Sequence, residues 1–159
     1  MNPVTHRPAT IQDAVWVAEH LREQDRKEVL ASNGGDFQKA LVDSFLSSTS
    51  CTAWELRGKV ICISGVAPAA FPGPFSGGAV PWMLGTDGML EASKSLVKQG
   101  RKFIEGYLQD FPCLFNFVHA HNTTSIAWLH RLGFRFGQLI PEYGVGKQPF
   151  ILFYRYRNV

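Results

Sequence analysis

The sequence predicts an α/β domain built on one mixed β-sheet that is flanked by helices on both faces. Three observations indicate this fold class. Helical and strand-like periodicities alternate along the chain, residues 113–120 are apolar on both faces of a strand, and no composition break divides the 159 residues. A strand that is apolar on both faces is typical of the middle of a covered sheet. We therefore expect residues 1–159 to form a single domain.

The amino-terminal third predicts one strand and three helices. Residues 6–10 begin as a short strand, and Thr10 with Asp13 approaches a capping box that opens a helix over residues 11–21. The apolar face of that helix consists of Ala14, Val17, Ala18 and Leu21. The charged residues 22–30 predict a second helix. After two glycines, residues 36–46 predict a third.

The middle of the chain changes to a strand-like period. Residues 51–67 predict a hairpin that turns at residues 57–59. Residues 68–79 are dense in proline and glycine and predict a loop, which is long enough to face a partner. Residues 80–85 then predict a strand that ends in a glycine-containing turn.

The carboxy-terminal half predicts two helices and three strands. Residues 90–110 form the longest expected helix, and residues 113–120 form a strand. In "AHNTTSIAWLHRLGF", Asn122, Thr123 or Thr124 can cap a helix, and Gly133 can end it in the left-handed conformation. The segments "FRFGQLI" and "PFILFYRYR" predict the last two strands. The expected order is β-α-α-α-β-β-β-α-β-α-β-β.

Charge, cysteines and apolar runs exclude several classes of function. The net charge of +3 suits an anionic ligand but lacks the dense basic patch of a nucleic-acid-binding protein, so nucleic acid is not an expected partner. Cys51, Cys62 and Cys113 form no metal-binding spacing, and we expect free, mostly buried thiols rather than a nucleophile. No run is long enough to span a membrane, and no secretion signal begins the chain, so we expect a cytoplasmic protein.

The element order, "HRPAT..DA" near the start and "HNTTSIAWLHRLGF" near the end resemble the GNAT (Gcn5-related N-acetyltransferase) fold. This resemblance implies that the sheet splays between its fourth and fifth strands, here residues 80–85 and 114–120, and that the pantetheine arm of acetyl-CoA enters the gap. Asn122 stands eleven residues before Gly133, the spacing of a cofactor-facing asparagine in that family. The resemblance also implies cofactor contacts from Met83, Leu84, Gly85, Thr86 and Gly88.

More narrowly, "PWMLGTD" and the segment "FNFVHAHNTTSIAWLHRLGF" resemble a GNAT-like family of short-tailed bacteriophages, some of whose members are internal virion or core proteins. This resemblance implies a protein of the host cytoplasm or of the virion. It also implies a virion or host protein as partner.

Three features depart from the GNAT pattern. Only Gly88 agrees with the family's phosphate-binding loop, and Asp87 would bring a negative charge to an anion site. Leu129 occupies the position where many members have a proton-donating tyrosine. No glutamate stands out in the sequence as a general base.

Two residues are candidates for catalysis. Asp87 could act as a general base or cap the following helix. His119 could accept a proton at neutral pH. His121 lies on the same side of the strand, so the two side chains could also bind a metal or form hydrogen bonds at the edge of the sheet. No third metal ligand is evident. Lys94, Lys98, Arg101 and Lys102 share a helix face that could meet coenzyme A phosphates or solvent.

Two functions follow as hypotheses. The first is a phage-encoded accessory protein with a degenerate acetyl-CoA site that acts by binding a virion or host protein. The second is an acetyl-CoA-dependent N-acyltransferase in which Asp87 or His119 accepts the proton of an amine. The degenerate loop and Leu129 favour the first, and Asn122 favours the second.

Overall fold

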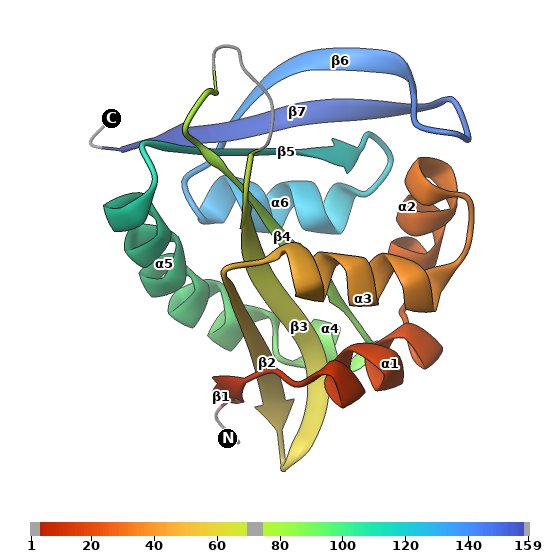
Figure 1. Ribbon diagram of the computed structural model, residues 1–159, viewed down its shortest axis with the longest axis vertical. Helices are drawn as coiled ribbons and strands as arrows, with labels where there is room; N and C mark the ends of the chain where they lie inside the picture. Colours follow the sequence, from red (N-terminus) through yellow and green to blue (C-terminus); the bar gives the residue numbers. More distant parts are fainter. Residues whose placement is uncertain (1–3, 70–74, 158–159) are drawn as a thin grey trace.

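A computed structural model describes residues 4–69 and 75–157. Its centre is a seven-stranded mixed sheet in the order β1-β2-β3-β4-β5-β7-β6, in which β4 and β5 are the parallel neighbours and the other pairs are antiparallel. Figure 1 shows β1 at one end of this sheet and β6, with β7 beside it, at the other.

The elements follow the order expected from the sequence, with one additional short helix, α4. The strands are β1 (Val4–Pro8), β2 (Ser50–Leu56), β3 (Lys59–Pro68), β4 (Ala79–Gly85), β5 (Cys113–His119), β6 (Arg135–Tyr143) and β7 (Gln148–Tyr156). The helices are α1 (Ile11–Glu19), α2 (Glu23–Asn33), α3 (Phe37–Ser47), α4 (Gly88–Glu91), α5 (Ser93–Asp110) and α6 (Thr123–Arg131).

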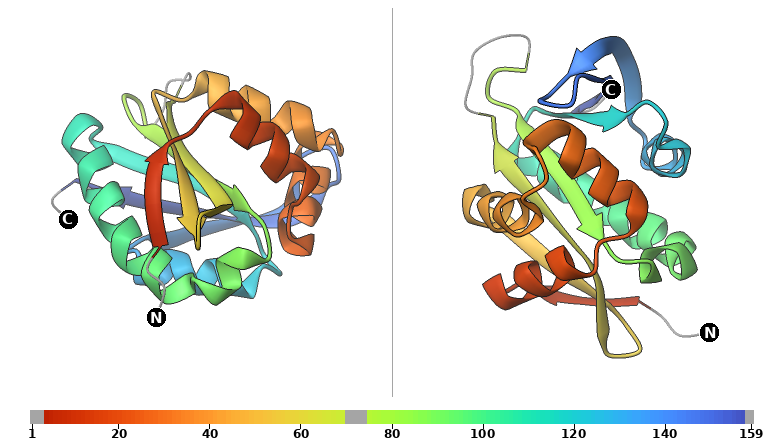
Figure 2. Two further views of the ribbon diagram at one scale, coloured as in Figure 1. Left: turned by 90° about the horizontal axis from the view of Figure 1, so that it is seen from below. Right: turned by 90° about the vertical axis from the view of Figure 1, so that its right-hand side faces the viewer.

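Helices cover both faces of the sheet. Helices α1 and α3 pack on one face, where Val17, Leu41 and Ile63 are fully buried. Helices α5 and α6 pack on the other face, over cores that include Leu96, Leu114 and Phe153. Figure 2 shows α1 and α3 separated from α4 and α5 by the strands. Burial of these apolar side chains supplies the main driving force for the fold.

The sheet opens between β4 and β5. The two strands share one paired position, Ala79 with Leu114, and then diverge. Just beyond that position, the Asn116 side chain donates from Nδ2 to the Pro81 carbonyl oxygen at 2.9 Å. A side-chain hydrogen bond thus replaces a backbone bond where the strands separate. The splay expected between residues 80–85 and 114–120 is confirmed.

Local signals in the sequence account for most element boundaries. The capping box of Thr10 and Asp13 is present, and Asn122 is the residue whose side chain caps α6. Gly133 has a φ of 90° and lets Phe134 donate its backbone N–H to the Leu129 carbonyl oxygen at 3.1 Å, which ends the helix.

One expected element needs correction. The helix expected over residues 90–110 is divided at Ala92 into α4 and α5. The last strand, β7, lies between β5 and β6, which a linear reading of the sequence did not specify. Residues 70–74 of the loop expected over residues 68–79 lie outside the described residues.

Candidate ligand site in the strand gap

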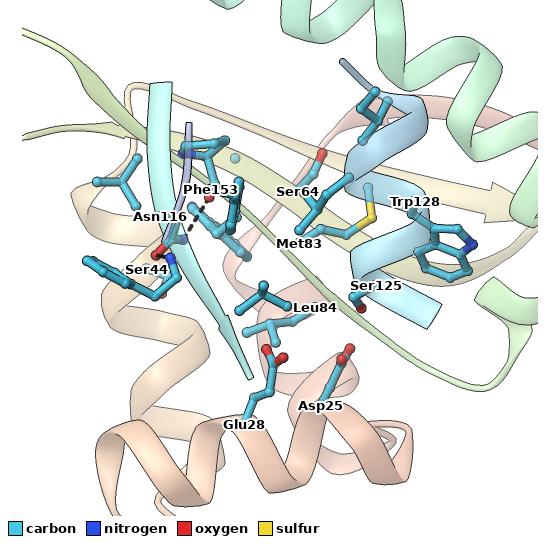
Figure 3. Close-up of a pocket in the computed structure, with 18 of the residues that line it drawn as sticks. Asp25, Glu28, Ser44, Ser64, Met83, Leu84, Asn116, Ser125, Trp128 and Phe153 are labelled. Carbon is cyan, nitrogen blue, oxygen red and sulfur yellow. Dashed lines mark hydrogen bonds between the residues drawn. The ribbon is translucent and has the colours of Figure 1, made fainter. Parts of the chain in front are cut away.

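A cavity of about 500 Å³ passes through the gap between β4 and β5. Figure 3 shows its walls: β4 and β5 flank the opening, α6 contributes Ser125 and Trp128, and α2 lies across one end. A volume of this size suits a small molecule. The lining is apolar on the side of α5 and α6 and carries charge on the side of α2.

The gap-facing edge of β4 is partly occupied by other parts of the chain. Pro81 accepts from Asn116, and Gly85 donates its N–H to the Asp25 carboxylate, Oδ2, at 2.9 Å. Backbone groups of alternate residues point the same way along a strand, so Met83, midway between them, also faces the gap. Met83 has no pairing partner on β5. Its backbone is therefore the part of this edge that a ligand can reach.

Helix α2 bridges the open end of the gap with two carboxylates. Asp25 holds the Gly85 N–H at the end of β4, and Glu28 accepts from the His119 N–H, Oε1 to N 3.1 Å, at the end of β5. Residues three apart lie on the same face of a helix, so both side chains point into the gap (Figure 3). The carboxylates thus take the backbone donors that the diverging strands leave unpaired.

Arg22 completes the charged end of the cavity. Its guanidinium, in a side chain that is 6% exposed, lies 2.9 Å from Asp25 Oδ1 and 2.9 Å from Ser125 Oγ, and its centre is 5.5 Å from the Trp128 ring. The backbone N–H of Arg22 donates to the Gly85 carbonyl oxygen at 2.8 Å. The ion pair keeps the Asp25 carboxylate compensated, although burial raises the pKa of Asp25.

Glu28 is partly buried and has no cationic partner at salt-bridge distance among the described residues. Both of its printed hydrogen bonds, from His119 N and from Asn122 Nδ2 at 2.8 Å, go to Oε1. The other oxygen, Oε2, accepts none from the described part of the chain. Burial raises the pKa of Glu28, and the hydrogen bond from Asn122 opposes this shift. Glu28 is therefore a carboxyl group with one oxygen free toward the cavity.

Asn122 lies beside this cluster with its amide already bonded. Its Nδ2 donates to Glu28, and its Oδ1 accepts from the Ser125 N–H at 3.2 Å in the first turn of α6. The side chain is 2% exposed and does not line the cavity. In this structure Asn122 caps α6 and holds Glu28.

The loop after β4 is the part of the site that would meet the pyrophosphate of coenzyme A in the arrangement implied by the resemblance. Its N–H groups are mostly used within the protein: Thr86 donates to the Ile61 carbonyl oxygen at 2.8 Å, and Gly88 donates to Thr86 Oγ1 at 3.2 Å. A Cβ on Gly88 would lie 2.6 Å from Ile61 Cγ2, so this glycine lets the loop pack on β3. In this structure the N–H groups of Thr86 and Gly88 are therefore engaged within the protein, whereas a pyrophosphate site at a helix start uses free N–H donors.

The remaining candidates lie away from the cavity. Asp87 precedes α4 and makes no side-chain cap, contrary to the capping role considered for it, because Thr86 provides the acceptor instead. His119 is 7% exposed, and its Nδ1 accepts from the His121 N–H at 3.2 Å, which requires a neutral nitrogen. Burial lowers the pKa of His119. Of the residues expected at the site, Met83 and Leu84 line the cavity.

Sequence analysis missed Asp25 and Glu28. Both stand in the run "EQDRKE", which has the composition of a solvated helix surface. Their spacing of three residues places them together on α2, but nothing in the sequence indicates that this face of α2 covers the gap. Only the tertiary fold identifies them.

The three cysteines are as expected from the sequence. Cys51, Cys62 and Cys113 are free, the last two are buried, and burial raises the pKa of all three thiols. Within residues 4–69 and 75–157, no three His, Cys, Asp or Glu side chains come together to hold a metal ion. No described helix has the length and apolar character needed to cross a membrane.

Comparison with known proteins shows the fold. No family model matches the sequence, and no curated protein is similar to it in sequence. An N-acetyltransferase from Staphylococcus aureus aligns with a TM-score of 0.72 and 11% identity, over 98% of this chain and 99% of the other. The protein yncA from Salmonella typhimurium, solved with its cofactor acetyl-CoA, aligns with a TM-score of 0.68 and 17% identity, over 99% and 95%.

AAC(6')-Ib, solved in complex with ribostamycin and coenzyme A, aligns with a TM-score of 0.66 and 17% identity, over 98% of this chain and 94% of the other. At sequence identities this low, the structural similarity shows the overall fold and no functional property. The chain has the GNAT fold, with the parallel β4–β5 pair and the flanking helices of that class.

Proposed function

We propose that this protein is a GNAT-fold accessory protein with a degenerate acetyl-CoA site, which acts by binding rather than by acetyl transfer. The observation that carries this proposal is the bonding of the loop after β4. The N–H groups of Gly85, Thr86 and Gly88, which would face a pyrophosphate, all donate within the chain. A pyrophosphate could bind these N–H groups only if the three bonds were broken, which would leave their acceptors, among them the buried Asp25 carboxylate, without these partners.

Charge supports the same proposal. Asp25 and Glu28 stand at the open end of the gap, and Asp87 stands in the loop itself. Arg22 compensates Asp25, so the uncompensated charges are those of Glu28 and Asp87, and these oppose the approach of a polyanion such as coenzyme A. In this proposal the fold provides a stable scaffold with an internal cavity, but the loop after β4 does not bind the phosphates of acetyl-CoA.

The partner in this proposal is a virion or host protein, in the host cytoplasm or the virion, as the resemblance to phage internal proteins implies. The test is affinity capture of tagged protein from phage-infected cells, followed by size-exclusion chromatography with light scattering. We expect one partner that co-elutes in a fixed stoichiometry. Capture that repeatedly yields only the tagged protein would contradict the proposal.

A second candidate function, N-acyl transfer to an amine, is favoured by one specific observation. Glu28 Oε2 accepts no hydrogen bond from residues 4–69 and 75–157 and belongs to a side chain that points into the gap, and the backbone of Met83 also faces the gap. A carboxylate there could take a proton from a bound amine. An acyl-CoA donor would supply the activated acyl group.

The second candidate is tested by following free thiol release from acetyl-CoA with a panel of amines. Release that depends on an amine and falls about 100-fold in Glu28→Gln would support acyl transfer, in line with the usual contribution of a general base. No release above the uncatalysed rate with any amine would exclude it, and the binding function would stand.

A further inference from the structure

We propose that the outward side of α5 is a docking surface for an acidic segment of a partner protein. This surface, called the basic face below, consists of Lys94, Lys98, Arg101 and Lys102 on α5 and of Arg131 in the last turn of α6. The proposal rests on the binding function proposed above and names the part of the molecule that contacts the partner. It involves neither the cavity in the strand gap nor the loop after β4.

Three lysines of the basic face form a straight row. Lys94, Lys98 and Lys102 follow one another at intervals of four residues, so they lie above one another on one side of the helix. All three are exposed, whereas Leu96 and Ile104 on the inward side of α5 are buried. Figure 1 shows α5 along the outside of the molecule. Since a helix rises about 1.5 Å per residue, the row is about 12 Å long.

The acidic residues at either end of the row are engaged by arginines from other elements. Glu91, three residues before the row, accepts from both Nη atoms of Arg57, at 2.8 and 3.0 Å. Glu105, three residues after it, pairs with Arg155. Each arginine compensates its glutamate, so neither carboxylate is available to the lysines. No lysine of the row takes part in an ion pair within the described residues.

Two arginines extend the basic face toward α6. Arg101 donates from Nε to the Arg131 carbonyl oxygen at 3.0 Å, which brings the end of α6 beside the lysine row. Neither the Nη atoms of Arg101 nor the Arg131 guanidinium has an acceptor in the described part of the chain. Like charges this close repel one another, and a partner that brings carboxylates removes the repulsion. Charge complementarity therefore favours an acidic partner.

The extent of the basic face favours a protein over a nucleic acid. The surface of α5 changes sign toward its carboxy-terminal end, where Glu105 and Asp110 are exposed. A protein that holds a nucleic acid by its phosphates commonly neutralises about six to ten of them, which is more than the basic face can contact. The exposed positions of α5, all of them described, include no aromatic side chain on which a base could stack.

Fluorescence anisotropy with a labelled peptide tests the basic face directly. The probe is an alanine-based helical peptide of about 20 residues with glutamate at every fourth position, and the same peptide with glutamine is the neutral control. We expect the glutamate peptide to bind at least about tenfold more tightly than the glutamine peptide, and to lose affinity as NaCl rises from about 50 to about 300 mM. No binding of the glutamate peptide, or tighter binding of a short DNA duplex, would overturn the proposal.

Removing the lysine charges tests the assignment to this face. Glutamine is also a good helix former, so the variant that replaces all three exposed lysines should fold and bind the glutamate peptide at least about tenfold less tightly: Lys94→Gln/Lys98→Gln/Lys102→Gln. The matched control removes the same charge from exposed positions elsewhere and should bind as the wild type does: Lys27→Gln/Lys59→Gln/Lys147→Gln. An equal loss in both variants would show an effect of net charge alone and overturn the assignment. Displacement of the peptide by micromolar coenzyme A would assign the row to phosphates instead and also overturn it.

Capture from infected cells separates a failure of this surface from a failure of the binding function. We expect the partner that the wild type and the matched control retain to be lost from the variant without the lysine row. A partner that this variant retains would overturn the docking surface and leave the proposed function standing. Capture that yields no partner with any of the three proteins would contradict the proposed function, and the peptide titration would still decide whether the basic face binds acidic segments.

Discussion

Asp25 Oδ2 and the backbone nitrogen of Gly85 are joined by a hydrogen bond of 2.9 Å, which ties α2 to the end of β4. The same carboxylate pairs with Arg22 through Oδ1. One buried side chain thus compensates a guanidinium and satisfies a strand-end donor. The Arg22–Asp25–Gly85 contact is what closes one side of the strand gap.

Asp25→Ala should be strongly destabilising. The substitution leaves the Arg22 guanidinium buried without its counter-charge and the Gly85 N–H without an acceptor, so we expect a loss of about 3 kcal/mol or more in the free energy of unfolding. Urea denaturation at neutral pH measures this loss. Glu23→Gln is the control. A loss below about 1 kcal/mol for Asp25→Ala would show that the buried pair contributes little.

Stability should fall as pH rises above the ordinary pKa of the buried carboxyls. Burial raises the pKa of Glu28 from its ordinary value of 4.5 and that of Asp25 from 3.8. In the window between the unfolded and the folded pKa, the native state holds protons that the unfolded state has released. The stability that these groups provide is therefore present below the unfolded pKa and is lost as pH rises through the folded pKa.

Glu28→Gln should remove part of this pH dependence. The amide does not titrate, so the negative contribution of Glu28 to the slope of unfolding free energy against pH should disappear above pH 4.5, while the contributions of other shifted groups, such as Asp25 and His119, remain. Urea titrations at a series of pH values measure the slope. An unchanged slope in Glu28→Gln would mean that Glu28 does not have a raised pKa.

Gly85→Ala should disrupt the end of β4. An added Cβ would lie 2.4 Å from Met89 Sδ, 2.5 Å from Cys62 Cβ and 2.6 Å from the Ile61 carbonyl oxygen, and the last two atoms cannot move without shifting β3. We expect a loss of about 2 kcal/mol from overpacking. Gly106→Ala is the control, because nothing lies within 4 Å of its added Cβ. Equal melting temperatures for the two variants would contradict the tight packing at Gly85.

Tyr107→Phe should keep or increase stability. Burial raises the pKa of Tyr107 to about 12, against an opposing contribution from the neighbouring Ser64 hydroxyl, so the Tyr107 hydroxyl is neutral at physiological pH, and it makes no well-formed hydrogen bond within the described residues. Removing an unsatisfied buried polar group while keeping the ring is neutral or stabilising, by up to about 1 kcal/mol. Thermal unfolding measures the change. A loss of more than about 1 kcal/mol would reveal a hydrogen bond or bound water at the hydroxyl.

The sequence predicted much of the fold because its signals are local. The capping box at Thr10, the turn at Arg57 and Gly58, and the helix end at Gly133 depend on neighbouring residues, and each is present in the structure. The break at Ala92 was not predicted, because the helical periodicity runs across it without interruption. The insertion of β7 between β5 and β6 depends on long-range pairing that no local pattern specifies.

The candidate site was less predictable than the fold. Met83 and Leu84 were placed at the gap through the family resemblance, and they line the cavity. The cofactor role expected for Asn122 stays a prediction, since its amide is bonded to Glu28 and to α6. The catalytic roles of Asp87 and His119 also stay predictions. Asp25 and Glu28 could not be found from the sequence because their burial is a consequence of where α2 docks.

The most direct test of the degenerate cofactor site is calorimetric titration of acetyl-CoA and of coenzyme A into the purified protein. The engaged N–H groups of residues 85–88 and the carboxylates around the gap predict no heat of binding up to millimolar ligand, which corresponds to a binding free energy weaker than about −4 kcal/mol. Micromolar binding of either ligand would contradict the account. It would show that the loop opens and that the GNAT fold retains its acyl donor here.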